Sequence, residues 1–124
     1  MIKTELVQFI DELRRSDGSG ECPIRMAMDT IGGRWKLRIL SQMLRYEKLR
    51  FNELKRNIIG ITNTMLACSL KELEAAKLIT RIQYNEMPLR VEYSLTEVGI
   101  SILPVLFELS KWWRHYQAET LTIQ

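Results

Sequence analysis

The sequence feature that most limits the fold is a change of hydrophobic periodicity after residue 78. Before this point, apolar residues recur every three or four positions, as in Leu66, Leu70 and Leu73. After it, the segments 79–84 and 90–95 are short, alternate in polarity and are separated by a loop. We therefore expect a mainly α fold with one small β-hairpin.

Amphipathic helical patterns cover most of the remaining chain. They occur at residues 3–15, from Pro23 to the Gly32–Gly33 pair, around Trp35–Met43, at 51–58, from Thr62 to about Ala76, and from Thr96 through Tyr116. Residues 16–21 are rich in Ser, Asp and Gly and form a linker by composition. Pro104 falls inside the last pattern and is expected to bend that helix, because its ring removes the bond to the Ile100 carbonyl.

Two short helices joined by a tight turn at Gly60, with the hairpin following, have the order of a winged helix–turn–helix. In that fold the second helix enters the major groove of DNA, and the hairpin reaches a neighbouring groove or the backbone. The net charge of +3 permits a phosphate-rich partner without requiring one. A small helical domain with a purely structural hairpin has the same order, so the pattern leaves both interpretations open.

The expected recognition helix has an apolar face, and its opposite face is the candidate DNA-contacting surface. The candidate residues on this helix are Thr62, Asn63, Thr64, Ala67, Cys68 and Lys71. Thr and Lys side chains bond to bases or phosphates, and Ala packs on the thymine methyl group. Basic residues around the unit are candidates for phosphate contacts: Arg34, Lys36, Arg50, Lys55, Arg56, Arg81 and Arg90. A merely solvated face remains the alternative.

Several short segments, taken together, resemble the HxlR family of bacterial winged-helix regulators, which are relatives of the MarR-type regulators. The segments are Cys22-Pro23, Ile31-Gly32-Gly33-Arg34-Trp35-Lys36, Arg50-Phe51-Asn52-Glu53-Leu54, Gly60-Ile61-Thr62, Met65-Leu66, Leu70-Lys71-Glu72-Leu73-Glu74 and Val91-Glu92-Tyr93-Ser94-Leu95-Thr96. Their order and spacing make the resemblance specific. It implies a homodimer with an interface of terminal helices, an inverted-repeat operator in double-stranded DNA, and a role as repressor or activator.

Three parts of the chain are expected on this basis. Residues 1–21 form an N-terminal helix and linker, residues 22–117 the winged helix–turn–helix with a C-terminal dimerisation helix, and residues 118–124 a tail. The expected dimer-interface residues are Leu6, Phe9, Leu13, Leu109, Trp112, Trp113 and Tyr116. The two tryptophans could instead line a small-molecule pocket.

The resemblance also implies a redox or electrophile sensor at Cys22. A thiol at a helix start faces the positive end of the helix dipole, which favours the thiolate, and Arg25 one turn later adds to this. The structural alternative is a small N-cap residue at the dimer interface. Cys68 is expected to be a small groove-facing residue.

Other functional classes find little support. Cys22 and Cys68 lie far apart and His115 is the one histidine, so we expect neither a metal nor a cofactor. The sequence has no phosphate-cradling Gly-rich loop and no nucleophile with a base partner, so we expect no enzyme. No apolar run has membrane-spanning length and the N-terminus does not resemble a signal peptide, so we expect a cytoplasmic protein. A regulator induced by an unknown small molecule and a winged-helix protein adaptor remain alternatives.

Overall fold

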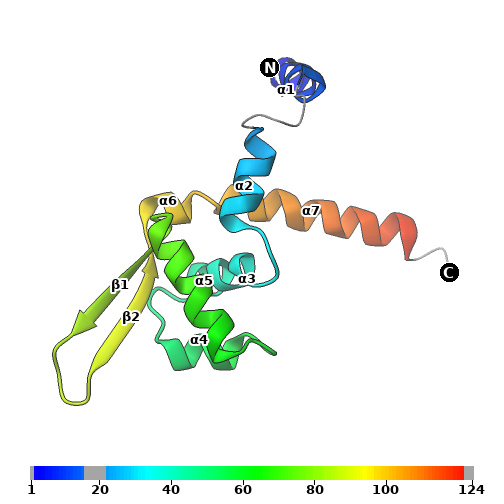
Figure 1. Cartoon of the computed structure of the whole chain (residues 1–124). Helices are drawn as coiled ribbons and strands as arrows, with labels where there is room; N and C mark the ends of the chain where they lie inside the picture. The colour runs from blue at the N-terminus through cyan, green and yellow to red at the C-terminus, as the bar shows by residue number, and fades with distance from the viewer. Residues whose placement is uncertain (1, 16–21, 122–124) are drawn as a thin grey trace. The chain divides into compact units, whose positions relative to one another are not determined.

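The computed structural model describes residues 2–15 and 22–121, which fall into two compact units divided after Gly33 (Figure 1). The first unit contains α1 (Ile2–Arg15) and α2 (Pro23–Ile31). Cys22 is the N-cap residue of α2, Pro23 is its first residue and Gly32 its C-cap, as the sequence predicts. The expected linker at 16–21 lies outside the described residues.

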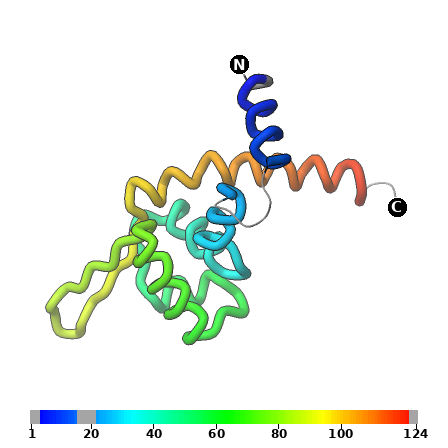
Figure 2. The backbone as a smooth tube through the Cα atoms, turned by 45° about the horizontal axis from the view of Figure 1, so that its top comes forward, coloured from blue at the N-terminus to red at the C-terminus, as the bar shows by residue number. Residues whose placement is uncertain are grey.

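The second unit is mainly helical and carries one hairpin, which confirms the expected fold class. Its elements are α3 (Lys36–Arg45), α4 (Phe51–Asn57), α5 (Asn63–Ala75), β1 (Ile79–Tyr84), β2 (Arg90–Leu95), α6 (Glu97–Ile100) and α7 (Leu103–Thr120). The strands β1 and β2 pair antiparallel, from Ile79 opposite Leu95 to Tyr84 opposite Arg90, and project as a narrow arm (Figures 1 and 2). This arrangement is a winged helix.

An isolated β-bridge joins the base of the hairpin to the segment before α4. The backbone N–H of Leu49 donates to Tyr93 O at 3.0 Å, and the Tyr93 N–H donates to Leu49 O at 2.8 Å. Sequence reasoning missed this bridge because a single residue pair leaves no periodic pattern.

The core of the second unit lies between α3, α4, α5 and the base of the hairpin. Its fully buried side chains are those of Ile39, Leu40, Leu54, Ile58, Leu66 and Leu73. Leu78 and Ile79 are also buried and extend the core to the start of β1. The three leucines of α5 that the 4–3 spacing predicts to be inward, Leu66, Leu70 and Leu73, are all at most 2% exposed.

Thr96 and Gly99 fix the end of β2 against the start of β1. The Thr96 hydroxyl donates to Lys77 O at 2.7 Å and accepts from the Gly99 N–H at 3.0 Å. A Cβ at Gly99 would lie 2.1 Å from the backbone oxygen of Leu78, so no larger residue fits without a backbone shift. The hairpin is therefore held at its base by the Thr96 hydroxyl and by the close approach of the Gly99 and Leu78 backbones.

The segment after the hairpin forms two helices, and the prediction of one bent helix is wrong. The one-turn helix α6 ends at Ile100, and α7 begins at Leu103. Pro104 lies in the first turn of α7, where a backbone N–H has no intrahelical partner, so the proline costs no helical hydrogen bond. It therefore marks the start of α7. Among the described residues, no helix combines the length and the apolar character needed to cross a membrane.

Candidate nucleic-acid interface

The helix α5 has one face in the core and one face in solvent. Thr62 is its N-cap, and the Thr62 hydroxyl accepts a hydrogen bond from the Met65 N–H at 3.1 Å, as expected. Opposite the buried leucines, the structure places the predicted candidates on the surface. Thr62, Asn63, Thr64, Cys68 and Lys71 are exposed, and Ala67 is half-buried.

The hairpin lies close to this face of α5. A hollow of about 420 Å³ is lined by Ala67 and Lys71 of α5, Arg81 of β1 and Tyr93 of β2, with Phe51, Leu70 and Glu74 also in its lining. Ala67 and Lys71, two of the candidates on α5, therefore border the same hollow as the hairpin residues Arg81 and Tyr93.

Two of the predicted phosphate-contacting cations already pair with carboxylates. Lys36 Nζ lies 2.8 Å from Glu72 Oε2, and its side chain is only 14% exposed. The Arg90 guanidinium lies 2.9 Å from Glu86 Oε1 and 3.8 Å from Glu92 Oε2, and 4.0 Å above the ring of Tyr84. Both side chains contribute to packing between elements, which their position in the sequence did not indicate.

Other predicted cations are more open. Arg34 is exposed and its guanidinium carbon lies 4.7 Å from the ring centroid of Trp35. Arg50 caps α4, and its backbone N–H donates to Glu53 Oε1 at 2.8 Å. An open hollow of about 600 Å³ at this helix start is lined by Lys48, Arg50, Asn52, Glu53, Arg56 and Glu92. Sequence reasoning missed Lys48, which precedes the buried Leu49 outside any periodic pattern.

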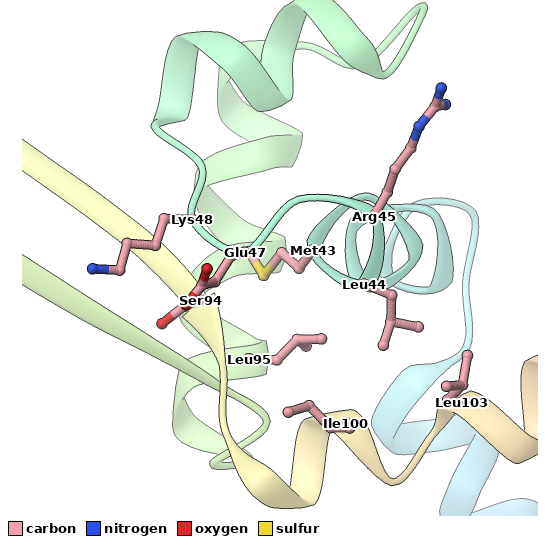
Figure 3. Close-up of a pocket in the computed structure, with 9 residues that line it drawn as sticks. All are labelled: Met43, Leu44, Arg45, Glu47, Lys48, Ser94, Leu95, Ile100 and Leu103. Carbon is pink, nitrogen blue, oxygen red and sulfur yellow. The ribbon is translucent and has the colours of Figure 1, made fainter.

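A different kind of hollow, of about 650 Å³, lies where α3, β2 and the α6–α7 break meet (Figure 3). Met43, Leu95, Ile100 and Leu103 give it an apolar lining, and Figure 3 shows the Arg45 and Lys48 side chains extending away from that lining. Its volume lies in the range of small-molecule sites.

The two cysteines lie in different units. Cys22 is half-buried and its side chain makes no capping hydrogen bond, whereas Cys68 is exposed on α5. In the described part of the chain, no three His, Cys, Asp or Glu residues are grouped so that they could hold a metal ion.

The predicted dimer-interface residues are exposed apolar side chains. On α1 these are Leu6, Phe9 and Leu13, and on α7 they are Leu109, Trp112, Trp113 and Tyr116. The rings of Trp112 and Trp113 stack on Tyr116 at centroid distances of 5.3 and 5.4 Å. No residue of the 18-residue helix α7 is buried within the chain.

Comparison with known proteins agrees with this architecture. A family model described as HxlR-like helix-turn-helix matches residues 30–120. An HTH-type transcriptional regulator of Methanothermobacter thermautotrophicus, itself uncharacterised, is 46% identical over 77% of this chain and 72% of its own. The solved structure of the redox regulator HypR in its oxidised form superposes with a TM-score of 0.70 at 39% identity, over 76% of this chain and 96% of HypR. The reduced form of the Bacillus subtilis transcriptional regulator YodB superposes with a TM-score of 0.67 at 34% identity, over 75% of this chain and 91% of YodB. The chain therefore belongs to the HxlR-like helix-turn-helix family.

Proposed function

We propose that this chain is a sequence-specific, double-stranded-DNA-binding transcriptional regulator that acts as a homodimer. The observation that carries the proposal is the exposed polar face of α5 beside the hairpin, opposite a face of buried leucines. Its relatives are helix-turn-helix transcriptional regulators, which supports the same use of this face.

The residues divide into two roles in this proposal. Thr64, Ala67, Cys68 and Lys71 meet base edges in the major groove, and Thr62 and Asn63 meet the backbone at the start of α5. Arg34 and Arg50 contact phosphates. Lys36 and Arg90 act mainly by holding α5 and the hairpin in place, because their charges already face carboxylates.

The homodimer would bind an inverted-repeat operator, with one α5 in each half-site. Half-sites lie about one helical turn apart, roughly 34 Å, so two recognition helices at a fixed spacing are required. The exposed apolar faces of α1 and α7 are the proposed interface, since a second copy would remove their aromatic and aliphatic side chains from water.

We further propose that Cys22 makes the regulator responsive to oxidants or electrophiles. Two observations support this role. Cys22 is the N-cap residue of α2 but its thiol makes no capping hydrogen bond, and the structural neighbour HypR is a redox regulator. A regulator induced by a small ligand is the second candidate, and the 650 Å³ hollow in Figure 3 favours it.

The test of DNA binding uses the full chain and duplexes from the region beside its own gene. We expect binding that weakens steeply with salt, because phosphate contacts release counterions. Lys71→Ala should weaken specific binding, whereas Lys111→Ala, on α7, should leave it unchanged. A chain that binds no duplex at low salt but captures a protein partner would support the adaptor alternative and overturn the proposal.

A further inference from the structure

Two arginine guanidinium groups lie against one indole ring beside the turn that precedes α5. The Cζ atoms of Arg34 and Arg38 are 4.7 and 5.0 Å from the ring centroid of Trp35. Trp35 is 8% exposed, so its ring is a fixed surface, whereas both arginines are exposed. Cation–π contacts of this kind restrict where the guanidinium groups lie.

The same contacts place Arg38 next to the start of the recognition helix. Arg38 Nη2 donates to the carbonyl oxygen of Ile59 at 3.4 Å. Gly60, with φ of +91°, lies so close to Trp35 that an added Cβ would be 3.8 Å from the indole Cη2. Two residues later Thr62 caps α5. The positive charge of Arg38 is thus held at the turn from which α5 begins.

Neither arginine has a carboxylate partner within residues 2–15 and 22–121. The ion pairs found there involve Lys36, Arg90 and Lys111 instead. Two cations on one ring without a counter-charge attract an anion. Guanidinium groups suit phosphate because they bind it through two parallel N–H donors, and restraint by the ring lowers the entropy lost on binding.

This cationic pair is well separated from the hairpin. The hairpin follows the C-terminal end of α5, while the turn at Gly60 precedes its N-terminal end. The 13 residues of α5 extend roughly 20 Å at the rise of an α-helix. The proposed contact beside Trp35 therefore lies at the opposite end of α5 from the base of the hairpin.

We propose that Arg34 and Arg38, held against Trp35, form a clamp for one backbone phosphate of duplex DNA beside the start of α5. The inference rests on the proposed function and deepens it. It adds Arg38, which sequence reasoning did not single out, as a phosphate contact and makes Trp35 the residue that positions both arginines.

The test measures binding of the full-length protein to a mixed-sequence duplex of about three helical turns, by fluorescence anisotropy across a salt series. The key variant is Arg38→Gln, because glutamine is polar and uncharged and therefore removes the positive charge without placing an apolar side chain on the surface. Arg34→Gln is the second variant. Arg45→Gln is the matched control, since Arg45 ends α3 and its guanidinium carbon lies 5.5 Å from the ring centroid of Tyr46.

Each clamp variant should bind all duplexes more weakly and flatten the log–log salt slope by about 0.9 per lost phosphate contact. Between about 50 and about 200 mM salt, the ratio of wild-type to variant affinity should then shrink about 3.5-fold per protomer. Thermal melts of Arg38→Gln should still show a cooperative unfolding transition, so that weaker binding does not come from a misfolded protein.

Three results would overturn the clamp or its basis. A wild-type slope in Arg38→Gln shows that Arg38 touches no phosphate, although the DNA-binding function stands. An equal slope change in Arg45→Gln shows that general surface charge is responsible. Wild-type protein that binds no duplex at low salt removes the proposed function, and the clamp with it.

Discussion

The ammonium of Lys36 and a carboxylate oxygen of Glu72 lie 2.8 Å apart, and this ion pair joins α3 to the solvent edge of α5. The Lys36 side chain is largely buried, whereas that of Glu72 is 62% exposed, so the pair is only partly shielded from water. Lys36 therefore fastens α3 to α5, the proposed recognition helix.

Lys36→Met keeps most of the apolar stem and removes the charge. We expect the free energy of unfolding to fall by about 1 kcal/mol, as for a partly buried ion pair, with the salt slope of DNA binding unchanged. Urea melts measure the free energy of unfolding, and fluorescence anisotropy across a salt series measures the salt slope of DNA binding. Lys111→Met is the control, because its 2.9 Å pair with Glu108 lies on an exposed helix surface and should contribute less. A flattened slope in Lys36→Met would instead make Lys36 a direct phosphate contact, as its sequence position suggests.

The two faces of α5 should respond to alanine in opposite ways. Leu73 is fully buried, so Leu73→Ala should lower the free energy of unfolding by about 2–5 kcal/mol. Lys71→Ala, two residues earlier on the exposed face, should change stability by no more than about 0.5 kcal/mol but weaken DNA binding. Urea melts and mobility shifts on the same proteins separate the effects. Equal stability losses at both positions would contradict the assignment of faces.

The base of the hairpin should not tolerate a side chain at Gly99. Gly99→Ala forces a shift of the Leu78 carbonyl, which also accepts the Thr96 backbone N–H at 3.0 Å. We expect a loss of about 3 kcal/mol or more, in the range of overpacking and a disturbed backbone hydrogen bond together. Ile100→Ala next to it, half exposed, is the control and should cost much less. A melting temperature of Gly99→Ala equal to that of the wild type would refute the close approach.

Local patterns were enough to predict most of this fold. The 4–3 spacing of leucines identified the buried face of α5, Thr62 its start, and strand alternation the hairpin. Pro104 was misinterpreted because a proline in the first turn of a helix and one that bends a helix look alike when the preceding break is only two residues long. The carboxylate partners of Lys36 and Arg90 were missed because the fold decides which acidic side chains come close to these cations, and the sequence pattern does not show it. Arg38 was missed although it stands three residues after Trp35, a spacing that places both on one helix face.

The aromatic cluster of α7 should matter for assembly more than for folding of the single chain. Trp112 is 59% exposed and stacks on Tyr116, so Trp112→Ala removes little buried area within one protomer. In the proposed dimer that side chain is buried, and its loss should cost on the order of 3 kcal/mol of dimer stability, about a hundredfold in the dissociation constant. Sedimentation across a concentration series measures this constant, with Lys111→Ala as the control. A wild-type protein that is monomeric at micromolar concentration would refute the dimer.

The response to oxidants should depend on Cys22 more than on Cys68. Cys22 is the N-cap residue of α2, at the positive end of the helix dipole, and its thiol makes no capping hydrogen bond. Cys68 lies in the middle of α5, away from both helix ends, so it should react more slowly although it is more exposed. Diamide titration of DNA binding in wild type, Cys22→Ser and Cys68→Ser separates the two, with reversal by dithiothreitol as the check for thiol chemistry. We expect the response to disappear in Cys22→Ser and to persist in Cys68→Ser.

Loss of the response in Cys68→Ser alone would place the chemistry on the proposed DNA-contacting face of α5, where a modified thiol blocks the groove directly. A response that survives in both single variants and in the double variant does not come from these thiols, and the apolar hollow beside the α6–α7 break then becomes the site at which to search for an inducer.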